Sequence, residues 1–325
     1  MTGIALLAGL AVVTVLVAWH GFGTVALAMS TMGAGVLLLP LVYAPHLAGG
    51  AASWRLLFLP GRRPPFFAAL RALWIGLSIE TLVPAASLGA EVMKARLLLR
   101  SGVRGNDAAA SVVVDLTVQG LVLALWGLVG VGALASAHAD PALTWSALAA
   151  AATLAAGVGG FLLAQRAGMF SFLGRAGGKA IRAGRWQGII DNAAQLDATI
   201  RALYDRPQRI LFACAIRCLS RSVLIVELWL AARLMGQPIT PVDAVMLVGI
   251  IGALRGAAFF IPGGWGVQEG GFVVLGGLLG LAPDFMLAVS LATRARELMV
   301  SIPGIAVWQV VEGRTLKRLV GQRPG

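Results

Sequence analysis

An apolar stretch towards the C-terminal end of the chain is interrupted by the sequence Pro-Gly-Gly-Trp-Gly at residues 262–266. Residues 245–261 before this break and 272–281 after it are apolar apart from Arg255. A helix cannot pass smoothly through the break, because proline removes an amide donor and each glycine costs about 1 kcal/mol of helix propensity. Within a bilayer, broken backbone is tolerated only where it is packed in protein or lines a watery cavity. We therefore predict a re-entrant hairpin that lines a transport or binding cavity; a glycine-rich loop outside the bilayer is the alternative.

The composition of the chain supports the bilayer interpretation of this break. Of the 325 residues, 58% are hydrophobic and 12% are charged, whereas soluble domains carry about 25% charged residues. We therefore predict an all-α, polytopic integral membrane protein. The net charge of +12 suits loops on the cytoplasmic side and anionic lipid headgroups, and we expect no nucleic-acid partner. The N-terminus lacks the basic region and cleavage site of a signal peptide, so we expect its apolar residues to form the first span.

The apolar stretches predict about six transmembrane helices, because a span needs about 20 residues. They are residues 3–19, 24–43, 108–135, 143–163, 210–234 and 285–311. A further stretch, residues 66–82 and the Pro-containing segment after it, has basic residues at both ends, so we predict a second re-entrant hairpin there. With this topology both termini and every strongly basic loop are cytoplasmic.

The predicted topology divides residues 1–325, a single transmembrane domain, into four parts. These are a first half of about 1–142, a cytoplasmic amphipathic segment of 165–209, a second half of about 210–312 and a cytoplasmic tail of 313–325. Within the amphipathic segment, apolar residues recur at helical spacing. Such a helix can lie on the inner leaflet or pack on the cytoplasmic end of the bundle, and both alternatives are open.

The two predicted hairpins share a pattern. Glu91 follows Pro84, and Glu269 follows Pro262, by the same number of positions. In the predicted topology the hairpins enter from opposite faces of the membrane. Two opposed hairpins with broken helices form the inverted repeat of many secondary transporters. A chance similarity between two Pro/Gly breaks is the alternative.

The sequence Pro-Gly-Gly-Trp-Gly-Val-Gln-Glu at residues 262–269, with Arg294 and Gly304 downstream, resembles the transmembrane family of the lysylphosphatidylglycerol synthase flippase domain. The resemblance covers nearly the whole chain. Residues 82–98 resemble the corresponding early site, but in the commoner family form the glycine and the acid are adjacent and closer to the proline. The longer spacing is similar to the subgroup associated with hopanoid biosynthesis. The resemblance implies lipid translocation or trafficking in the bacterial cytoplasmic membrane, and no synthase activity, because the fused aminoacyl-transferase domain has no counterpart in this sequence.

A lipid with a charged or polyhydroxyl headgroup needs polar partners in the core while its tails stay in the bilayer. The candidate substrate-binding residues are Glu91, Lys94, Arg96, Asp115, Arg255, Pro262, Gly263, Gly264, Trp265, Gly266, Gln268, Glu269, Arg294, Arg296 and Glu297. Our hypothesis is that Arg294 and Arg296 bind the headgroup, while Glu91 and Glu269 pair with them or carry coupling protons. The alternative is that these pairs are static salt bridges between helices. We expect Lys94 and Arg96 at the inner membrane surface, as headgroup anchors.

Three classes of function remain. The favoured class is a lipid flippase or transporter that moves a hopanoid-type or phospholipid-type lipid by alternating access, with ion coupling as one source of energy. The second is an accessory membrane subunit of a lipid (hopanoid) biosynthesis pathway, and the third is an intramembrane lipid-modifying enzyme. The sequence has no P-loop and no cluster of His and Cys ligands, so we expect no enzyme activity, no cofactor and no metal. Membrane lipids are the expected partners; homo-oligomers and lipid-biosynthesis proteins are further options.

Overall fold

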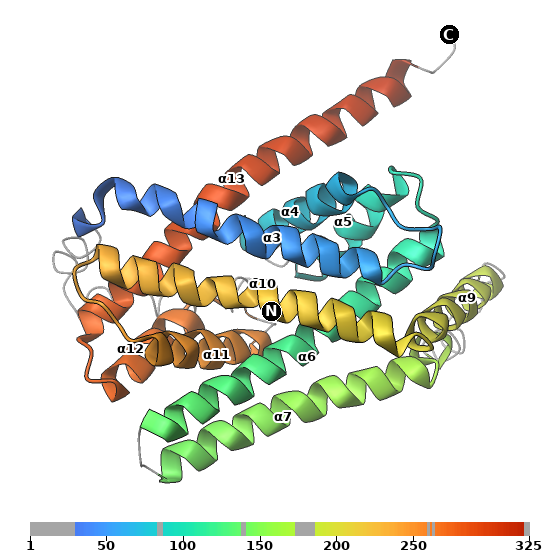
Figure 1. Cartoon of the computed structure of the whole chain (residues 1–325). Helices are drawn as coiled ribbons and strands as arrows, with labels where there is room; N and C mark the ends of the chain where they lie inside the picture. The colour runs from blue at the N-terminus through green and yellow to red at the C-terminus, as the bar shows by residue number, and fades with distance from the viewer. Residues whose placement is uncertain are drawn as a thin grey trace.

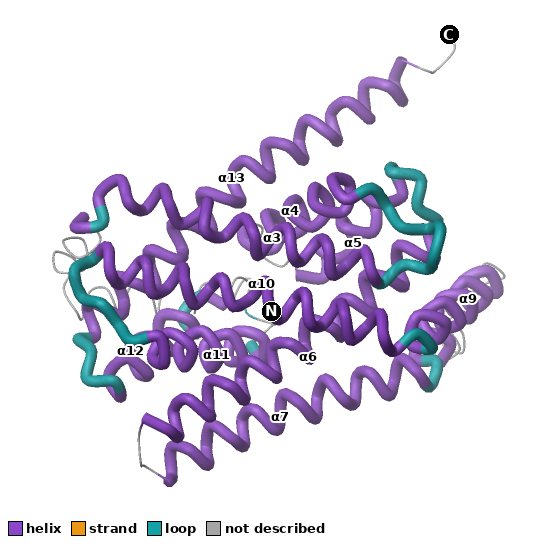
Figure 2. The backbone as a smooth tube through the Cα atoms, viewed as in Figure 1, coloured by secondary structure: helices purple, strands orange, loops and turns teal. Residues whose placement is uncertain are grey.

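The computed structural model describes residues 30–82, 87–137, 141–172, 186–258, 261 and 264–321. Every regular element within these residues is helical, and none is a strand (Figures 1 and 2). The elements are η1 (Gly33–Leu37), α3 (Leu38–Leu56), α4 (Phe66–Leu82), α5 (Ser87–Leu99), α6 (Gly105–Ala137), α7 (Pro141–Arg166), α9 (Trp186–Tyr204), α10 (Pro207–Leu234), α11 (Pro241–Ala257), α12 (Val267–Leu278) and α13 (Pro283–Gly321). The all-α prediction is therefore confirmed for these residues; the predicted first span, 3–19, lies outside them.

Two predicted helix ends are wrong. The span predicted to end at Tyr43 continues in α3 to Leu56, with Pro45 inside the helix. Membrane helices tolerate such a proline because neighbouring groups satisfy the backbone acceptor that it leaves free. At the other end of the chain, α13 includes Pro303 and continues to Gly321, through most of the predicted tail.

Both halves of the chain contain the same series of helices. In the first half, the short helices α4 and α5 flank residues 83–86 and are followed by the 33-residue α6. In the second half, α11 and α12 flank the Pro-Gly-Gly-Trp-Gly break and are followed by the 39-residue α13. The two short helices pack against each other in each half. The helices therefore end where the sequence predicted the two breaks.

The loops that connect the pair α4–α5 to the rest of the chain lie at one end of the bundle, and those of the pair α11–α12 lie at the opposite end (Figure 1). The loops before α4 and after α5 line one pocket of about 480 Å³, so both lie at the same end. Arg209, at the start of α10, donates to the carbonyl of Phe58 next to this pocket. The far end of α10 leads to Met235, which belongs to the same apolar cluster as Phe285 at the start of α13. The loops before α11 and after α12 therefore meet at the other end.

The halves also pack reciprocally. The long helix of the first half, α6, packs on α11, and the long helix of the second half, α13, packs on α4. The helices that precede the two hairpins, α3 and α10, pack on each other. Each half thus covers the first short helix of the other half.

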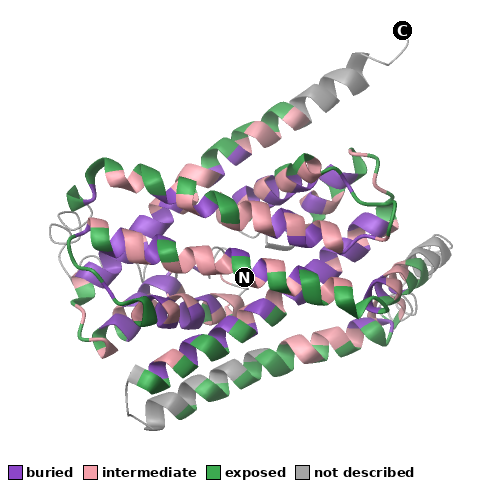
Figure 3. Ribbon diagram, viewed as in Figure 1, coloured by how far each residue is buried: buried purple, intermediate pink, exposed green. Residues whose placement is uncertain are grey.

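Large apolar side chains are exposed on the outside of the bundle, and charged side chains are buried within its apolar core. Figure 3 colours each residue by how far it is buried and shows exposed residues along the visible faces of α7 and α10. Phe67, Leu211 and Leu219 are 78%, 70% and 73% exposed, whereas Asp115 and Glu269 are fully buried. An apolar exterior around buried charges suits a lipid environment. Among the described helices, Gly33–Leu56 and Gly105–Ser136 are long and apolar enough to cross a membrane by length and composition. The charged residues along α10 and α13 make these helices less apolar.

The predicted amphipathic helix is present as α9, and it packs on α6 and α7. Ile200, Leu203 and Tyr204 are buried in this contact. The hydroxyl of Tyr204 donates to Oε1 of Gln165 over 2.7 Å. Of the two alternatives for this segment, the structure therefore favours a helix packed on the end of the bundle.

Glycines bring α6 and α11 into backbone contact. A Cβ atom at Gly249 would meet the carbonyl of Trp126 and would lie 2.9 Å from Cα of Gly130. A Cβ atom at Gly130 would in turn lie 2.9 Å from the backbone nitrogen of Ile250. Backbone atoms cannot move aside as a flexible side chain can, so these two positions require glycine.

We predict that Gly249→Ala lowers the free energy of unfolding by about 1–3 kcal/mol, because the added methyl group forces α6 and α11 apart. The matched control is Gly132→Ala on α6, where a Cβ atom has no neighbour within 4 Å. This control is expected to be neutral or to stabilise by up to about 1 kcal/mol. Unfolding of the purified variants in detergent measures both effects, and equal stability of the two variants would contradict the contact.

Candidate functional site

The break between α11 and α12 is built on glycines in left-handed backbone conformations. Gly264 has φ +61° and Gly266 has φ +82°, values that other residues adopt only with strain. The N–H of Gly266 donates to Oε2 of Glu269 over 2.8 Å. Glu269 therefore caps α12 from its third helical position, where a carboxylate also interacts favourably with the helix dipole. Pro262 and Gly263, two of the predicted site residues, lie outside the described residues.

Arg294 of α13 connects this break to the rest of the bundle. Its Nε donates to Oε1 of Glu269 over 2.8 Å, and one terminal nitrogen donates to the carbonyl of Gly264 over 3.1 Å. Its other terminal nitrogen donates to Oε2 of Glu297 over 2.8 Å. The guanidinium also lies 4.5 Å from the ring centre of Trp265. Arg294 thus holds the irregular backbone in place from a neighbouring helix.

Glu297 extends the set to α11. Its Oε1 accepts a hydrogen bond from Arg255 over 2.8 Å, and Arg255 also donates to Oε1 of Gln268. The amide of Gln268 donates to the hydroxyls of Ser290 and Thr293 on α13. We call Arg255, Glu269, Arg294 and Glu297 the α11–α13 ion network. It contains two cations and two carboxylates, so its formal charges cancel.

Arg296 makes a separate ion pair, although it lies only two positions beyond Arg294. Its Nε donates to Oε1 of Glu227 on α10 over 2.7 Å. Its guanidinium lies 4.0 Å from the ring centre of Tyr43 on α3. Two positions on a helix point in different directions, and so the two arginines bind different acids. Oε2 of Glu227 is buried and has no hydrogen-bond partner among the described residues.

Asp115 of α6 pairs with Arg217 of α10. Arg217 also donates to the carbonyl of Gly50 on α3 over 3.3 Å, and Gln119 donates to the second oxygen of Asp115 over 2.8 Å. This cluster joins three helices. The sequence predicted Asp115 as a site residue but did not predict its partner.

Glu91 and Lys94 pair with each other on α5 over 2.6 Å. The predicted surface position of Lys94 is wrong: its side chain is buried and lies against Gly76 of α4, where the absence of a Cβ atom makes room for it. Glu91 therefore does not pair with Arg294 or Arg296. Arg96, two positions beyond Lys94, is exposed as expected for a residue at the surface.

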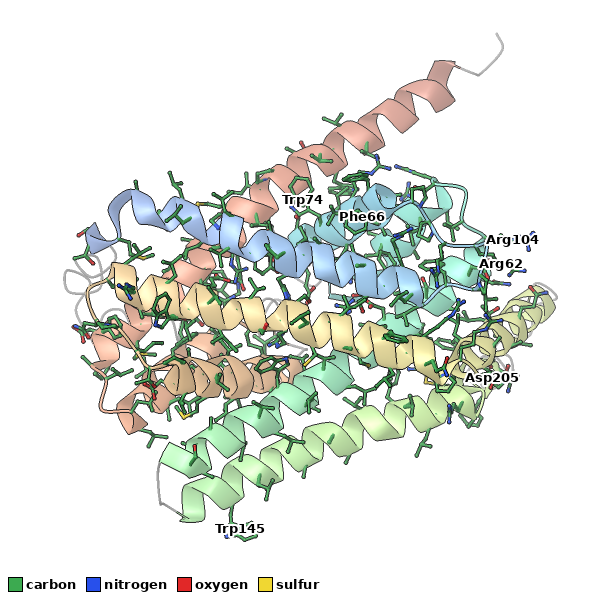
Figure 4. All side chains as sticks on the ribbon, viewed as in Figure 1. Arg62, Phe66, Trp74, Arg104, Trp145 and Asp205 are labelled. Atoms are coloured by element: carbon green, nitrogen blue, oxygen red, sulfur yellow. The ribbon has the colours of Figure 1, made fainter. Side chains whose placement is uncertain are left out.

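The structure brings together Gly264, Trp265, Gly266 and Gln268 with the α11–α13 ion network, and it places Asp115 and the Glu91–Lys94 pair elsewhere in the core (Figure 4 draws the side chains on the ribbon). Tyr43, Arg217 and Arg221 were not among the residues that the sequence predicted for the site. The available signal was the presence of charged residues in the middle of the long helix α10, since such residues are rare and functional in membrane helices. Among the described residues, no group of three or more His, Cys, Asp and Glu is arranged to hold a metal ion.

We predict that the Arg296–Glu227 pair is energetically coupled. Arg296→Met and Glu227→Leu should each cost about 3–5 kcal/mol of stability, because each leaves the opposite charge buried without its partner. The double variant should cost less than the sum of the single variants by about 0.5–3 kcal/mol. Arg62→Met is the control, since Arg62 is 45% exposed in its pair with Asp107 and such pairs contribute at most about 1 kcal/mol. Additive effects in detergent unfolding would show that the buried pair is not coupled.

Comparison with known proteins gives one match. The family model described as Lysylphosphatidylglycerol synthase TM region matches residues 6–304. A search of curated proteins and a search of solved structures found no match. The matched range includes the α11–α13 ion network and the other buried ion pairs described above. It does not distinguish the subgroup associated with hopanoid biosynthesis, which stays a prediction. Because the match covers most of the chain, this protein belongs to the family of lysylphosphatidylglycerol synthase transmembrane regions.

Proposed function

We propose that this protein moves a polar-headed lipid, of the hopanoid or phospholipid type, across the bacterial cytoplasmic membrane. The observation that carries the proposal is the α11–α13 ion network, which holds a broken helix inside a bundle with an apolar exterior. Buried charges at a helix break give a polar headgroup partners that the surrounding lipid lacks. The apolar exterior allows the acyl or polycyclic tails to stay in the bilayer.

Alternating access is the mechanism that the arrangement of helices supports. The two pairs of short helices open towards opposite ends of the bundle, and the halves pack reciprocally. An inverted repeat with two re-entrant hairpins would give this arrangement. In such a transporter the two halves rock against each other around a fixed site, so α6 on α11 and α13 on α4 are the contacts expected to slide.

The α11–α13 ion network would allow the helices around it to separate without leaving a buried charge unpaired. Arg294 binds two carboxylates and a carbonyl. A headgroup that takes over one of these bonds replaces one charge-assisted hydrogen bond with another, which offsets the cost of separating the helices. A proton on Glu269 would weaken its bond to Arg294 in the same way. This is our proposal for ion coupling, with Glu91 as the second acid that can carry a proton.

The orientation follows from the basic residues. Figure 4 shows Arg62, Arg104 and Asp205 at one end of the bundle and Trp145 at another. Arg63 lines the same pocket as Arg62 and Arg104. By the positive-inside rule this end is cytoplasmic, which agrees with the proposed cytoplasmic position of both termini. We further propose that the protein is not an enzyme, and that its partners are membrane lipids rather than nucleic acid; homo-oligomers and lipid-biosynthesis proteins are additional candidates.

The test is a translocation assay in proteoliposomes that contain labelled polar lipids, with and without a pH gradient. We expect the parental protein to move a labelled lipid and Glu269→Gln to reduce the rate by about tenfold or more, because the variant weakens a charge-assisted bond worth about 1.5–3 kcal/mol. The control is Glu80→Gln, since Glu80 is an exposed acid. A rate that responds to the gradient in the parent but not in Glu269→Gln would support proton coupling.

Two outcomes would count against the proposal. Movement at the parental rate in both Glu269→Gln and Arg294→Ala, with normal insertion, would remove the α11–α13 ion network from the mechanism. Failure of the monodisperse parental protein to move any lipid tested, with native lipid still bound, would favour the accessory-subunit function.

A further inference from the structure

Arg221 differs from the other interior cations in its surroundings. It lies near the middle of α10, and its guanidinium lies against Gly252 of α11, where Leu123 of α6 also approaches. Its Nε is buried and has no hydrogen-bond partner among the described residues. The side chain as a whole is neither fully buried nor exposed. Part of the residue is therefore accessible to another molecule.

Each of the other interior charged side chains described above forms an ion pair with a side chain of opposite charge. The pairs are Lys94–Glu91, Arg217–Asp115, Arg255–Glu297, Arg294–Glu269 and Arg296–Glu227. Arg221 forms no ion pair with the described residues, so this set of described side chains, the five pairs and Arg221, contains one cation more than it has acids. The undescribed residues 1–29 contain no Asp or Glu that could supply the missing charge.

The neighbours of Arg221 increase this imbalance. The charged side chains that act on it most strongly are Arg255 and Arg217, and both repel it. His46 of α3 donates through Nδ1 to the carbonyl of Ser220, the residue before Arg221. An uncompensated charge is costly in the interior of a membrane protein, and a bound anion removes that cost.

We propose that Arg221 binds the anionic headgroup of a membrane lipid. A planar guanidinium can hold a phosphate through two parallel hydrogen bonds. Leu224 and Ile225, one helical turn from Arg221 on the same face of α10, are partly exposed, so apolar surface for the lipid tails lies beside the site. This favours a lipid over a free anion. The inference rests on the proposed function and gives its substrate class: a lipid with net negative charge. It adds Arg221 to the proposed headgroup partners; unlike Arg294 and Arg296, Arg221 has no carboxylate that the headgroup must displace among the described residues.

The experiment measures thermal unfolding of the full chain in an uncharged detergent, by the fluorescence of its nine tryptophans. Three probes are titrated separately: phosphatidylglycerol, an uncharged glycolipid and inorganic phosphate. We expect the unfolding temperature of the parent to rise with phosphatidylglycerol alone. In Arg221→Gln, the concentration that gives half of the rise should increase about tenfold or more, as expected for the loss of a charged hydrogen-bond donor.

The stability of the lipid-free variants separates binding from a structural role. Without lipid, Arg221→Gln should unfold at the same temperature as the parent or a higher one, because it removes an uncompensated charge. Arg221→Lys keeps the charge and should retain part of the lipid response. The matched control is Arg233→Gln, which removes an exposed cation from the same helix and should leave the titration unchanged.

Two results would overturn the inference. If Arg221→Gln lowers the lipid-free unfolding temperature and keeps the phosphatidylglycerol response, Arg221 is a structural residue. If inorganic phosphate alone gives the same rise as the lipid, the ligand is a small anion. The experiments distinguish failure of this inference from failure of the proposed function. If lipid binding requires Arg221 but no lipid is translocated, only the transport proposal is contradicted. Translocation that Arg221→Gln leaves unchanged contradicts only the inference made from Arg221.

Discussion

Charge neutralisation in an apolar interior is the constraint that organises this bundle. A carboxylate or guanidinium that leaves water loses several kcal/mol of solvation, and only an opposite charge with good hydrogen-bond geometry restores it. A pair whose partners lie on different helices therefore fixes those two helices relative to each other. Glu269 and Arg294 join α12 to α13, Arg255 and Glu297 join α11 to α13, and other pairs join α10 to α6 and α13. Long helices that apolar packing alone would leave free to slide acquire a defined register.

Glycines make room for several of the interior cations. Among the described residues, Gly76, Gly252 and Gly264 each provide space for a cationic side chain, namely Lys94, Arg221 and Arg255. A Cβ atom at Gly76 or Gly252 would force the cationic side chain to move, and one at Gly264 would make a tight contact with Arg255. At Gly249 and Gly130 the absence of side chains instead allows two backbones to approach closely, as is common where membrane helices pack without a hydrophobic driving force. The abundance of glycine in the chain therefore serves both helix packing and the placement of charge.

The interior contains both charges that are paired and a cation, Arg221, that has no acidic partner among the described residues. The α11–α13 ion network is neutral and highly connected, and under the proposed transport mechanism its members would exchange partners as the two halves move. Arg221 has no such acidic partner among these residues, as expected if it binds the anionic ligand proposed above. Binding of an anionic headgroup next to Arg217 and Arg255 would reduce the repulsion among these cations. It would thereby couple occupation of the site to the stability of the neighbouring ion pairs.

The sequence alone determined the class of protein, the positions of both helix breaks and the presence of α9, because composition, Pro/Gly interruptions and helical spacing are local properties of a chain. It also predicted that Glu269 can pair with Arg294. The tertiary structure decided the remaining partners: Glu227 for Arg296, Arg217 for Asp115, and a buried Lys94 for Glu91. It also showed that Arg221 has no acidic partner among the residues that the structure describes. The physical reason is that helices in a bilayer are apolar on the faces towards lipid as well as towards protein, so periodicity does not reveal which way a charged residue points. Its partner comes from a helix that is distant in sequence, and only the packing of the bundle selects that helix.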